Sequence, residues 1–147
     1  MNLFDLQFRQ MQPEDYDDLV KLWIDAGLPY RSNGRDKRGK MLRELKNSNE
    51  ALFLAFRKER LLGAILASHD GRKGWINRLA VHPDFRKQGL AKILIEKAEN
   101  FLYEQGIEII ACLIEDWNSQ SMQLFTKVGY KRFDDIIYFT KKKHPGV

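Results

Sequence analysis

Four consecutive segments in the middle of the chain constrain the fold more than any other feature. An apolar, strand-like run from Trp75 to Val81 leads through a glycine-containing loop into a long amphipathic helix pattern, Leu90 to Gln105, and then into a second apolar run, Ile107 to Ile114. The residues from Ile109 to Ile114 are continuously apolar, which is typical of a strand covered on both faces. Because such a strand fits a parallel partner joined through the preceding helix, the sequence predicts a parallel strand–helix–strand unit.

The rest of the chain is expected to complete a mixed sheet flanked by helices. Short apolar runs separated by turn residues predict further strands at Leu6 to Met11, Ala51 to Phe56, Leu61 to Ala67, Tyr130 to Phe133 and Ile136 to Thr140. Helical spacing and capping residues predict further helices after Pro13, around Met41 to Leu45, and from Asn118 or Ser119 to Val128. The predicted fold class is α/β with a mixed central β-sheet, in a single domain over residues 1–147.

Length and composition are those of an ordinary globular domain. The 147 residues include 25 Lys and Arg against 20 Asp and Glu, a formal net charge of +5, and 44% are hydrophobic. No apolar run is long enough to cross a bilayer, and Met1 to Phe8 lacks the pattern of a secretory signal, so a cytoplasmic location and no membrane partner are expected. The single Cys112 lies inside an apolar run and is predicted to pack in the core rather than to react.

Positive charge is concentrated between Arg31 and Lys46, where seven basic residues accompany two acidic ones, and Lys141 to Lys143 forms a second basic run. Three interpretations are open: a solvated basic helix face, a nucleic-acid surface, and a few side chains that reach the phosphates of a nucleotide-containing ligand. A nucleic-acid partner is disfavoured because no exposed aromatic platforms accompany the basic residues.

The loop before the long helix reads Arg86-Lys87-Gln88-Gly89-Leu90-Ala91. A glycine-centred loop that opens into a helix gathers unpaired backbone N–H groups at the positive end of the helix dipole, which is a site for anions such as a pyrophosphate. The Walker A pattern is absent, because no lysine followed by serine or threonine stands at the helix start. The three spaced glycines of a dinucleotide fingerprint are also missing.

Two further segments accompany this loop. Leu79-Ala80-Val81-His82-Pro83 precedes it, and the segment from Asn118 to Tyr130 follows later in the chain. Together the three segments resemble the GCN5-related N-acetyltransferase (GNAT) family, whose phosphate loop reads Q/R-x-x-G-x-G/A. Arg86, Gly89 and Ala91 occupy the fixed positions of that loop. The likeness covers nearly the whole chain, and it implies the GNAT fold with acetyl-CoA, or a related acyl-CoA, as donor.

The resemblance also implies which positions bind the donor. The backbone of the family's fourth strand would pair with the pantetheine arm, and the loop N–H groups would bind the pyrophosphate. Asn118 and Ser121 would contact the cofactor arm, although capping and helix-surface hydrogen bonding are the alternative for both. The implied cofactor-binding residues are Leu79, Ala80, Val81, Arg86, Lys87, Gln88, Gly89, Leu90, Ala91, Lys92, Asn118, Ser121 and Phe125.

The chemistry implied by the family is direct transfer, in which a neutral amine attacks the thioester carbonyl and a backbone donor stabilises the oxyanion. The segment from Asn118 to Tyr130 resembles the family's second motif, and the tyrosine that often serves as acid in that motif is replaced here by Phe125. Candidate acids elsewhere, each otherwise a packed aromatic, are Tyr30, Tyr130 and Tyr138. Candidate bases, otherwise solvated residues at a strand end, are Glu115 and Asp116. The predicted catalytic residues are Glu115, Asp116 and Tyr138, and no metal is expected.

The predicted activity is therefore acetyl-CoA-dependent N-acetylation of a primary amine in a small molecule or peptide. The basic connection after the first helix favours an acidic acceptor over a polycation. The alternative is a non-catalytic acyl-CoA-binding or regulatory module, which the replacement at Phe125 supports. An exposed edge strand would allow a homodimer, although nothing in the sequence specifies one.

Overall fold

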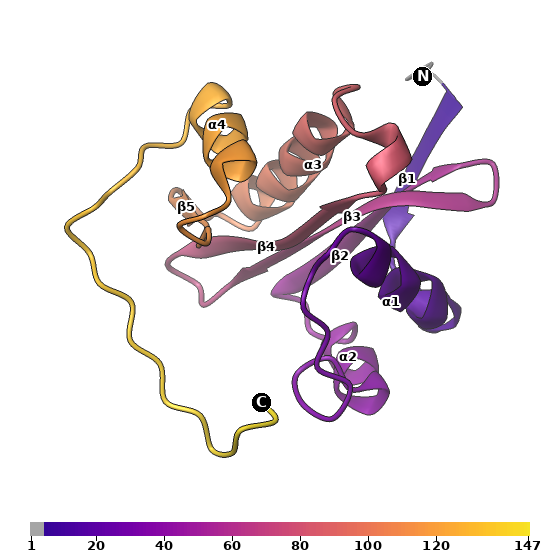
Figure 1. The fold of residues 1–147 in the computed structure, drawn as a ribbon, viewed down its shortest axis with the longest axis horizontal. Helices are drawn as coiled ribbons and strands as arrows, with labels where there is room; N and C mark the ends of the chain where they lie inside the picture. Colours follow the sequence, from indigo (N-terminus) through magenta and orange to yellow (C-terminus); the bar gives the residue numbers. More distant parts are fainter. Residues whose placement is uncertain (1–4) are drawn as a thin grey trace.

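The computed structural model describes residues 5–147, so Met1–Phe4, at the start of the segment assessed for a secretory signal, lie outside it. A five-stranded sheet crosses the molecule, with helices on both faces (Figure 1). The mixed α/β architecture predicted from the sequence is confirmed. The strands are β1 (Leu6–Gln10), β2 (Glu50–Arg57), β3 (Arg60–His69), β4 (Gly74–Val81) and β5 (Ile110–Ala111).

The strands lie across the sheet in chain order. β1 to β4 pair antiparallel, and β5 pairs parallel with β4. The parallel register aligns Gly74 with Ile110 and Trp75 with Ala111. α3 (Leu90–Glu104) joins β4 to β5, so the predicted parallel strand–helix–strand unit is confirmed.

Two helices cover each face of the sheet. α3 and α4 (Ser119–Lys127) lie on one face, and α1 (Tyr16–Asp25) and α2 (Arg38–Glu44) lie on the other (Figure 1). Short 3-10 helices, η2 (Pro13–Asp15) and η3 (Pro83–Phe85), precede α1 and the loop before α3. The helices fall where the sequence predicts them. In the described part of the chain, no helix has the length and apolarity needed to span a membrane.

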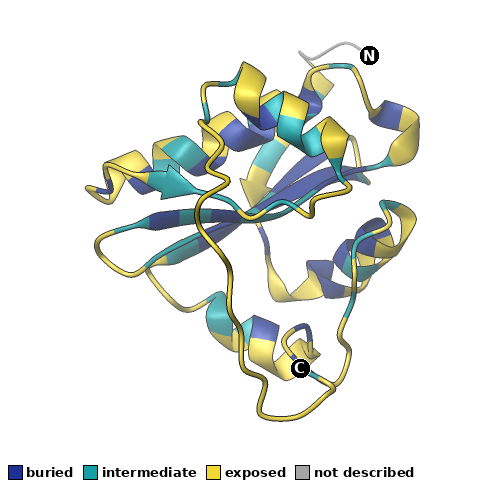
Figure 2. Ribbon diagram, turned by 60° about the vertical axis from the view of Figure 1, so that its left-hand side comes forward, coloured by how far each residue is buried: buried dark blue, intermediate teal, exposed yellow. Residues whose placement is uncertain are grey.

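Each face of the sheet has its own apolar core. Under α3, Leu94 and Ile95 are fully buried, and under α1, Leu19 and Trp23 are buried. Figure 2 shows the buried residues along the middle of the sheet and on the inward sides of the helices. Gly63 on β3 allows α3 to lie close, because a Cβ at this position would stand 2.9 Å from a methyl carbon of Leu94. Burial of these side chains fixes both helix layers on the sheet.

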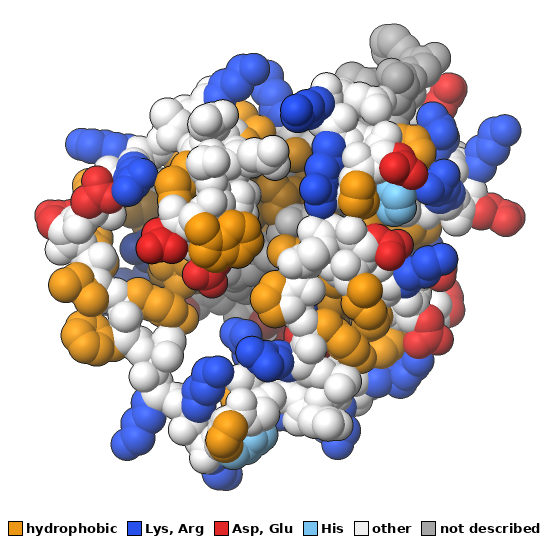
Figure 3. All heavy atoms as spheres, in the orientation of Figure 1, with side chains coloured by type: hydrophobic (Ala, Val, Ile, Leu, Met, Phe, Trp, Pro, Cys, Tyr) orange, Lys and Arg blue, Asp and Glu red, His pale blue; other side chains and the backbone are white. Residues whose placement is uncertain are grey.

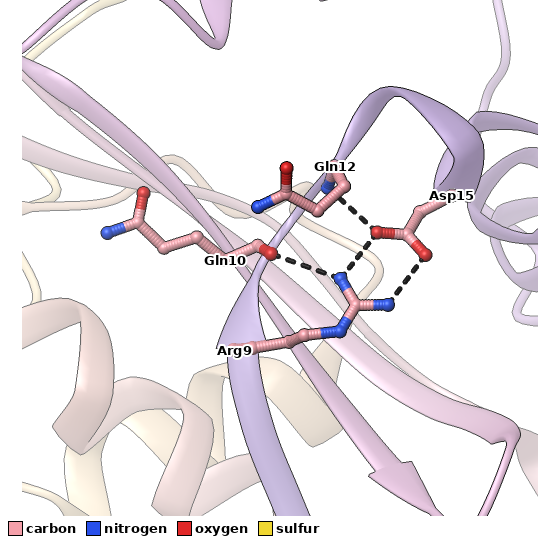
Figure 4. Close-up of polar contacts among 4 residues, drawn as sticks. All are labelled: Arg9, Gln10, Gln12 and Asp15. Carbon is pink, nitrogen blue, oxygen red and sulfur yellow. Dashed lines mark hydrogen bonds and ion pairs between the residues drawn. The ribbon is translucent and has the colours of Figure 1, made fainter.

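A buried carboxylate ties β1 to the start of α1. The Arg9 guanidinium donates to the two oxygens of Asp15 at 2.6 and 2.8 Å, and the backbone N–H of Gln12 donates to the same carboxylate at 2.7 Å (Figure 4). The Asp15 side chain is only 8% exposed. The hydrogen bonds from Arg9 favour the charged carboxylate and lower the pKa of Asp15, although its burial opposes this.

Two of the strand predictions are wrong, because residues 130–133 and 136–140 form no strand. A third is too long, because the run Ile107–Ile114 contains only the two-residue β5. Apolar and β-branched residues favour strands only where a neighbouring strand is available, and β5 is the last strand of the described sheet. After α4 the chain instead swings away from β5 and returns toward α2 (Figure 1).

Candidate active site

The loop predicted to bind an anion lies between β4 and α3, as the sequence predicts, and the 3-10 helix η3 precedes it. Its backbone is left-handed at two residues, with φ of 62° at Lys87 and 89° at Gly89, and α3 begins at Leu90. Left-handed residues in a turn direct successive backbone N–H groups into a shared concavity that binds anions. The positive end of the α3 dipole lies at the same place. Both features favour a phosphate group here.

The N–H groups of this loop have no protein partner. Within the described residues, the backbone N–H groups from Lys87 to Lys92 donate neither to a carbonyl nor to a side chain, and the first helical bond of this stretch is donated by Ile93 to Gly89. Six consecutive donors are therefore available to a ligand. The first five, from Lys87 to Ala91, are the positions whose N–H groups the resemblance implies for the pyrophosphate, and their binding role stays a prediction.

The space above Gly89 is open. A Cβ built on this residue would meet no atom within 4 Å, so the protein itself does not require a glycine there for lack of room. Its φ of 89° does favour glycine, because other residues are strained in this conformation. Gly71, in the β3–β4 turn, has the same properties, with φ of 90° and open space. The N–H of Gly71 donates to Nδ1 of His69 at 2.9 Å, whereas Gly89 lies among the unpaired N–H groups at the start of α3.

The Arg86 side chain is bound by the protein rather than presented to the loop. Its Nε donates to the carbonyl of Val81 at 3.1 Å, and its Nη2 donates to the carbonyl of Ala26 at 3.0 Å. Arg86 thus ties the loop to the end of β4 and the end of α1. Lys87 and Lys92 are exposed, and their side chains provide positive charge near the loop.

β4 and β5 separate before they reach the loop. Their pairing ends at Trp75 and Ala111, so the second half of β4 has no strand partner on this side among the described residues. This half contains Leu79, Ala80 and Val81, the positions implied for the pantetheine arm. Leu79 is half-buried and Ala80 is buried. An unpaired strand edge that leads to an anion-binding loop suits an elongated ligand with amide groups and a phosphate end.

A bulge in β4 marks the middle of this open edge. The register with β3 shifts between Ala64 and Leu66, and Arg78 has a φ of 56°. The bulge turns the Arg78 guanidinium across the sheet to α1, where it lies 4.1 Å from the ring centroid of Trp23. A bulge beside an open strand edge is a common feature of functional sites, because it redirects a side chain and interrupts pairing.

Arg78 fastens the connection between α1 and α2 to β4. Its Nη2 lies 2.9 Å from the Asp36 carboxylate, and its Nη1 donates to the carbonyl of Pro29 at 2.5 Å. The same carboxylate accepts the backbone N–H of Arg31 at 2.8 Å. Asp36 is 8% exposed and belongs to the buried residues of the chain. The connection is therefore held over the open half of β4 by partly buried charges.

Tyrosine hydroxyls extend this network. The hydroxyl of Tyr16 donates to the backbone carbonyl of Asp36 at 2.6 Å and lies 2.9 Å from the hydroxyl of Tyr30. Burial raises the pKa of Tyr16 to about 12, so this hydroxyl keeps its proton at neutral pH. Tyr30, a candidate acid, is thus part of the polar network that holds the α1–α2 connection.

The predicted catalytic residues are not brought together. Glu115 and Asp116 are exposed after β5, at the carboxyl end of the sheet's parallel pair. Tyr138 is 68% exposed in the extended segment after α4, and none of its atoms takes part in a hydrogen bond with another described residue. The two carboxylates therefore lie in the exposed stretch after β5, and Tyr138 lies on a separate segment. Their catalytic roles stay predictions.

The segment from Asn118 to Tyr130 forms the start and the core face of α4. Asn118 caps the helix by accepting the N–H of Ser121 at 3.2 Å, which is the alternative role considered for both residues. Phe125 is buried and packs edge-to-face on Tyr130, with ring centroids 5.0 Å apart. Tyr130 donates its hydroxyl to Glu99 at 2.8 Å, and burial together with this carboxylate raises the pKa of Tyr130. Tyr130 is therefore a structural residue rather than a free acid.

Cys112 is half-buried beside β5, and burial raises the pKa of its thiol to about 11. A thiol with this pKa is almost fully protonated at neutral pH and is a poor nucleophile. The prediction that Cys112 packs rather than reacts agrees with this environment.

Sequence reasoning missed the network around Arg78. A positive φ and a contact across 42 residues between Asp36 and Arg78 leave no local pattern. One signal was available, because Asp36 is one of only two acidic residues in the basic stretch from Arg31 to Lys46. An isolated acid among bases indicates a residue with a specific cationic partner.

Known sequences that resemble this chain over most of its length are acetyltransferases. The profile of the acetyltransferase (GNAT) family matches residues 4–130. A protein named acetyltransferase from Yersinia enterocolitica is 26% identical over 134 residues, which cover 90% of this chain and 92% of that protein. An acetyltransferase from Sodalis glossinidius is 25% identical over 139 residues, which cover 93% and 95% of the two chains.

Solved structures share the fold at low sequence identity. A PaiA N-acetyltransferase from Thermoplasma acidophilum, in complex with coenzyme A, has a TM-score of 0.78 at 20% identity and covers 89% of this chain and 92% of its own. An aminoglycoside acetyltransferase from an uncultured soil sample, in complex with trehalose, has a TM-score of 0.80 at 16% identity, with 98% and 100% covered. A third structure, of an acetyltransferase from Clostridium acetobutylicum with acetyl-CoA, has a TM-score of 0.75 at 18% identity. It covers 92% of this chain and 96% of its own.

Proposed function

Because the family profile spans residues 4–130, this chain belongs to the GNAT acetyltransferase family, and we propose that it transfers the acetyl group of acetyl-CoA to a primary amine. The observation that carries the proposal is the run of unpaired N–H groups from Lys87 to Lys92 beside the open edge of β4. An anion-binding loop at the end of an unpaired strand matches the two ends of the pantetheine–pyrophosphate part of the donor.

The loop would bind the donor mainly through its backbone. The N–H groups from Lys87 to Ala91 would donate to the pyrophosphate oxygens, and Lys87 and Lys92 would add charge from exposed positions. The main chain of Leu79, Ala80 and Val81 would pair with the amides of the pantetheine arm. This arrangement directs the thioester toward the bulge at Arg78, where β4 meets the α1–α2 connection.

The proposed reaction is a direct displacement. The amine nitrogen attacks the thioester carbon, the C–N bond forms, the C–S bond breaks, and CoA leaves as a thiolate that takes up a proton from water. A backbone N–H on the open edge of β4 would stabilise the negative charge on the carbonyl oxygen. The nitrogen loses one proton to a base or to water.

We propose Glu115 and Asp116 as candidates for that base, acting directly or through water. Both carboxylates are exposed at the end of the strand that borders the open edge. Phe125 cannot donate a proton, and its ring is buried against Tyr130. An amine that is already neutral, with a thiolate that leaves unassisted, requires no acid at this position. Tyr138 would have to move from its exposed position to serve as one.

The acceptor is proposed to approach from the α1–α2 connection and α2. Arg31, Arg35 and Lys37 are exposed there, whereas Asp36 is buried and paired. A surface of this sign would favour an amine that also carries a negative group and would disfavour a polycation. One structural neighbour is named an aminoglycoside acetyltransferase, but an aminoglycoside is a polycation, so we do not propose it as the acceptor of this chain. A cytoplasmic location stays a prediction.

The proposal is tested by the release of free CoA thiol from acetyl-CoA in the presence of amines of graded charge. We expect release that requires an amine, with the acetylated product identified by mass spectrometry, and faster turnover for acidic amines. Binding of CoA without release for any amine would instead support a non-catalytic acyl-CoA-binding module. In the same assay, Glu115→Gln and Asp116→Asn test the base, where loss of a true base lowers kcat at least about 100-fold. Glu108→Gln, also exposed near β5, is the matched control.

A further inference from the structure

The last residues of the chain pack on the connection between α1 and α2. A Cβ added to Gly34 would stand 2.5 Å from the carbonyl oxygen of Gly146 and 3.1 Å from the Cα of Val147. The N–H of Val147 donates to the carbonyl of His144 at 3.2 Å, so the chain turns at this contact. Figure 1 shows the C-terminus beside the connection and α2. The segment after α4, residues 131–147, is therefore anchored at its end, and we call it the tail.

The tail fills the space that a side chain would need at Gly34. This glycine is buried, whereas its neighbours Asn33 and Arg35 are exposed. Its φ lies outside the left-handed region, so the local backbone does not require a glycine. The close approach of the tail does require one, because any Cβ would overlap the Gly146 carbonyl. The contact between the connection and the tail is therefore part of the fold.

Before this anchor the backbone of the tail is not fixed. Residues 131–143 make no backbone hydrogen bond with any described residue. Lys141, Lys142 and Lys143 are exposed in this stretch and lie three to five residues before Gly146. Since a residue extends the chain by at most about 3.6 Å, the Cα atoms of these lysines stay within roughly 18 Å of the anchor. Three amines are thus kept near the connection without being held in one position.

The anchor lies beside the space where the thioester is expected. Gly34 is two residues from Asp36, whose carboxylate lies 2.9 Å from the Arg78 guanidinium at the bulge of β4. This bulge is the point toward which the proposed donor site directs the acetyl group. Figure 3 shows a hollow between the tail and the main body, with basic and acidic side chains on its border. The tail therefore borders the space that an acceptor amine would enter.

Charge and tethering favour the tail lysines over a free polycation. The exposed carboxylates of Glu115 and Asp116 would attract a lysine ammonium, whereas Arg31 and Arg35 would repel it. A tethered amine has an effective concentration in the millimolar range, which offsets this repulsion. Lys40 is also exposed, but its backbone is fixed in α2, so it cannot extend toward β4 as the tail can.

We infer that the protein acetylates its own tail at Lys141, Lys142 or Lys143, an inference that rests on the proposed function. The lysine ammonium releases a proton, and its neutral Nζ attacks the thioester carbon of acetyl-CoA bound to the same chain. The C–N bond forms, the C–S bond breaks, the nitrogen loses a second proton to a carboxylate or to water, and the CoA thiolate takes up a proton from water. The product is an uncharged acetyllysine, so each transfer removes one positive charge from the tail.

The first test is the incubation of the full-length protein with acetyl-CoA before any amine is added. We expect acetyl groups on residues 141–143 by peptide mass spectrometry, with an equal amount of thiol released. Acetylation there should be at least about 10-fold faster than at Lys58, which is exposed in the β2–β3 turn and measures the uncatalysed reaction. The rate constant should not depend on protein concentration, because each chain modifies itself. Tail acetylation no faster than at Lys58, or a rate constant proportional to protein concentration, would overturn the inference.

The second test removes the anchor with Gly34→Val. The valine side chain would displace Gly146, so tail acetylation should slow at least about 10-fold while the Kd for CoA stays unchanged. Gly39→Val on α2 is the matched control, because a Cβ at Gly39 meets open space and its φ is not left-handed, so the rate should persist. Thermal unfolding checks that both variants fold. Equal rates in Gly34→Val and the parent protein would contradict the anchored geometry.

A third variant does not depend on how the connection tolerates a larger residue. Replacement of all three tail lysines by arginine keeps the charge and removes the reactive amines, so the thiol released before amine is added should disappear. Release that persists in this variant would overturn the inference. If the parent protein turns over added amines while its tail stays unmodified, the inference fails and the proposed function stands. If neither reaction occurs, both fail.

Discussion

Two loops meet β4 and are built in opposite ways. The loop from Arg86 to Ala91 offers its own backbone N–H groups, and its geometry depends on two left-handed residues and a helix start. The α1–α2 connection is held by side chains, through the contact of Arg78 with Asp36 and the hydroxyls of Tyr16 and Tyr30. The first loop follows a short sequence pattern, whereas the second depends on contacts between distant residues.

This difference has a consequence for substitutions. A backbone-built site tolerates changes of most side chains but not a change that blocks its concavity or reverses its charge. A side-chain-built connection loses its support when one partner of an ion pair is removed, because the other partner is left with an uncompensated charge. Ligand affinity, stability and acid sensitivity therefore distinguish the two regions.

The largest effect is expected for Gly89→Glu. A carboxylate at this position would project into the open space above the loop and repel the pyrophosphate, so CoA affinity should fall at least about 100-fold, or about 2.7 kcal/mol. Isothermal titration calorimetry with CoA measures this directly. Gly71→Glu is the matched control, since it introduces the same residue at the same φ in an open turn away from the loop. Equal loss of affinity in both variants would count against the loop assignment.

The next largest effect is expected for Asp36→Asn. Removal of the charge beside the partly buried Arg78 should lower the free energy of unfolding by about 2 kcal/mol and loosen the α1–α2 connection. The KM for the amine should rise while the Kd for CoA stays unchanged. Asp17→Asn, which breaks the exposed pair with Arg38, should cost less than about 0.5 kcal/mol. A shift of CoA affinity in Asp36→Asn would show that the α1–α2 connection also affects binding at the loop from Arg86 to Ala91.

The sequence predicts one of these loops well and the other poorly. The glycine loop is encoded by adjacent residues, and its helix start, strand exit and open backbone follow from local rules. The bulge at Arg78 and its contact with Asp36 depend on tertiary packing, which no periodic pattern records. The prediction of strands after α4 is wrong for another reason. The residues there favour a strand, but the described chain offers no neighbouring strand.

A smaller effect is expected for Asp15→Asn, which breaks the bidentate contact with Arg9 at the start of α1. At pH 7 the variant should be less stable by about 1 kcal/mol. The pKa of Asp15 is lowered in the folded protein, so its contribution is complete above its unfolded pKa of about 3.9 and is lost as the pH falls through its lower folded value. The difference between the two proteins should therefore disappear in denaturant melts at strongly acidic pH.

Asp134→Asn provides the control for this experiment, because its pair with Arg132 is exposed on both sides. It should change stability by less than about 0.5 kcal/mol at any pH. A stability difference for Asp15→Asn that stays constant down to the most acidic pH would contradict the role assigned to the Asp15 charge.

The smallest effect is expected for Lys87→Ala. The Lys87 side chain is exposed, and its charge is screened by salt, so CoA affinity should fall less than about 3-fold at physiological ionic strength. The same calorimetric titration measures this change, repeated at low salt where the loss should grow. A loss as large as that of Gly89→Glu would mean that side-chain charge, and not the backbone, carries pyrophosphate binding.

Amide hydrogen exchange with and without acetyl-CoA tests the central claim most directly. The account predicts that the N–H groups of residues 87–92, which have no protein partner, become strongly protected when the ligand binds, together with those of residues 79–81 that face the open edge of β4 and not β3. Protection that appears elsewhere in the molecule while residues 87–92 exchange as fast as before would contradict a backbone-built donor site.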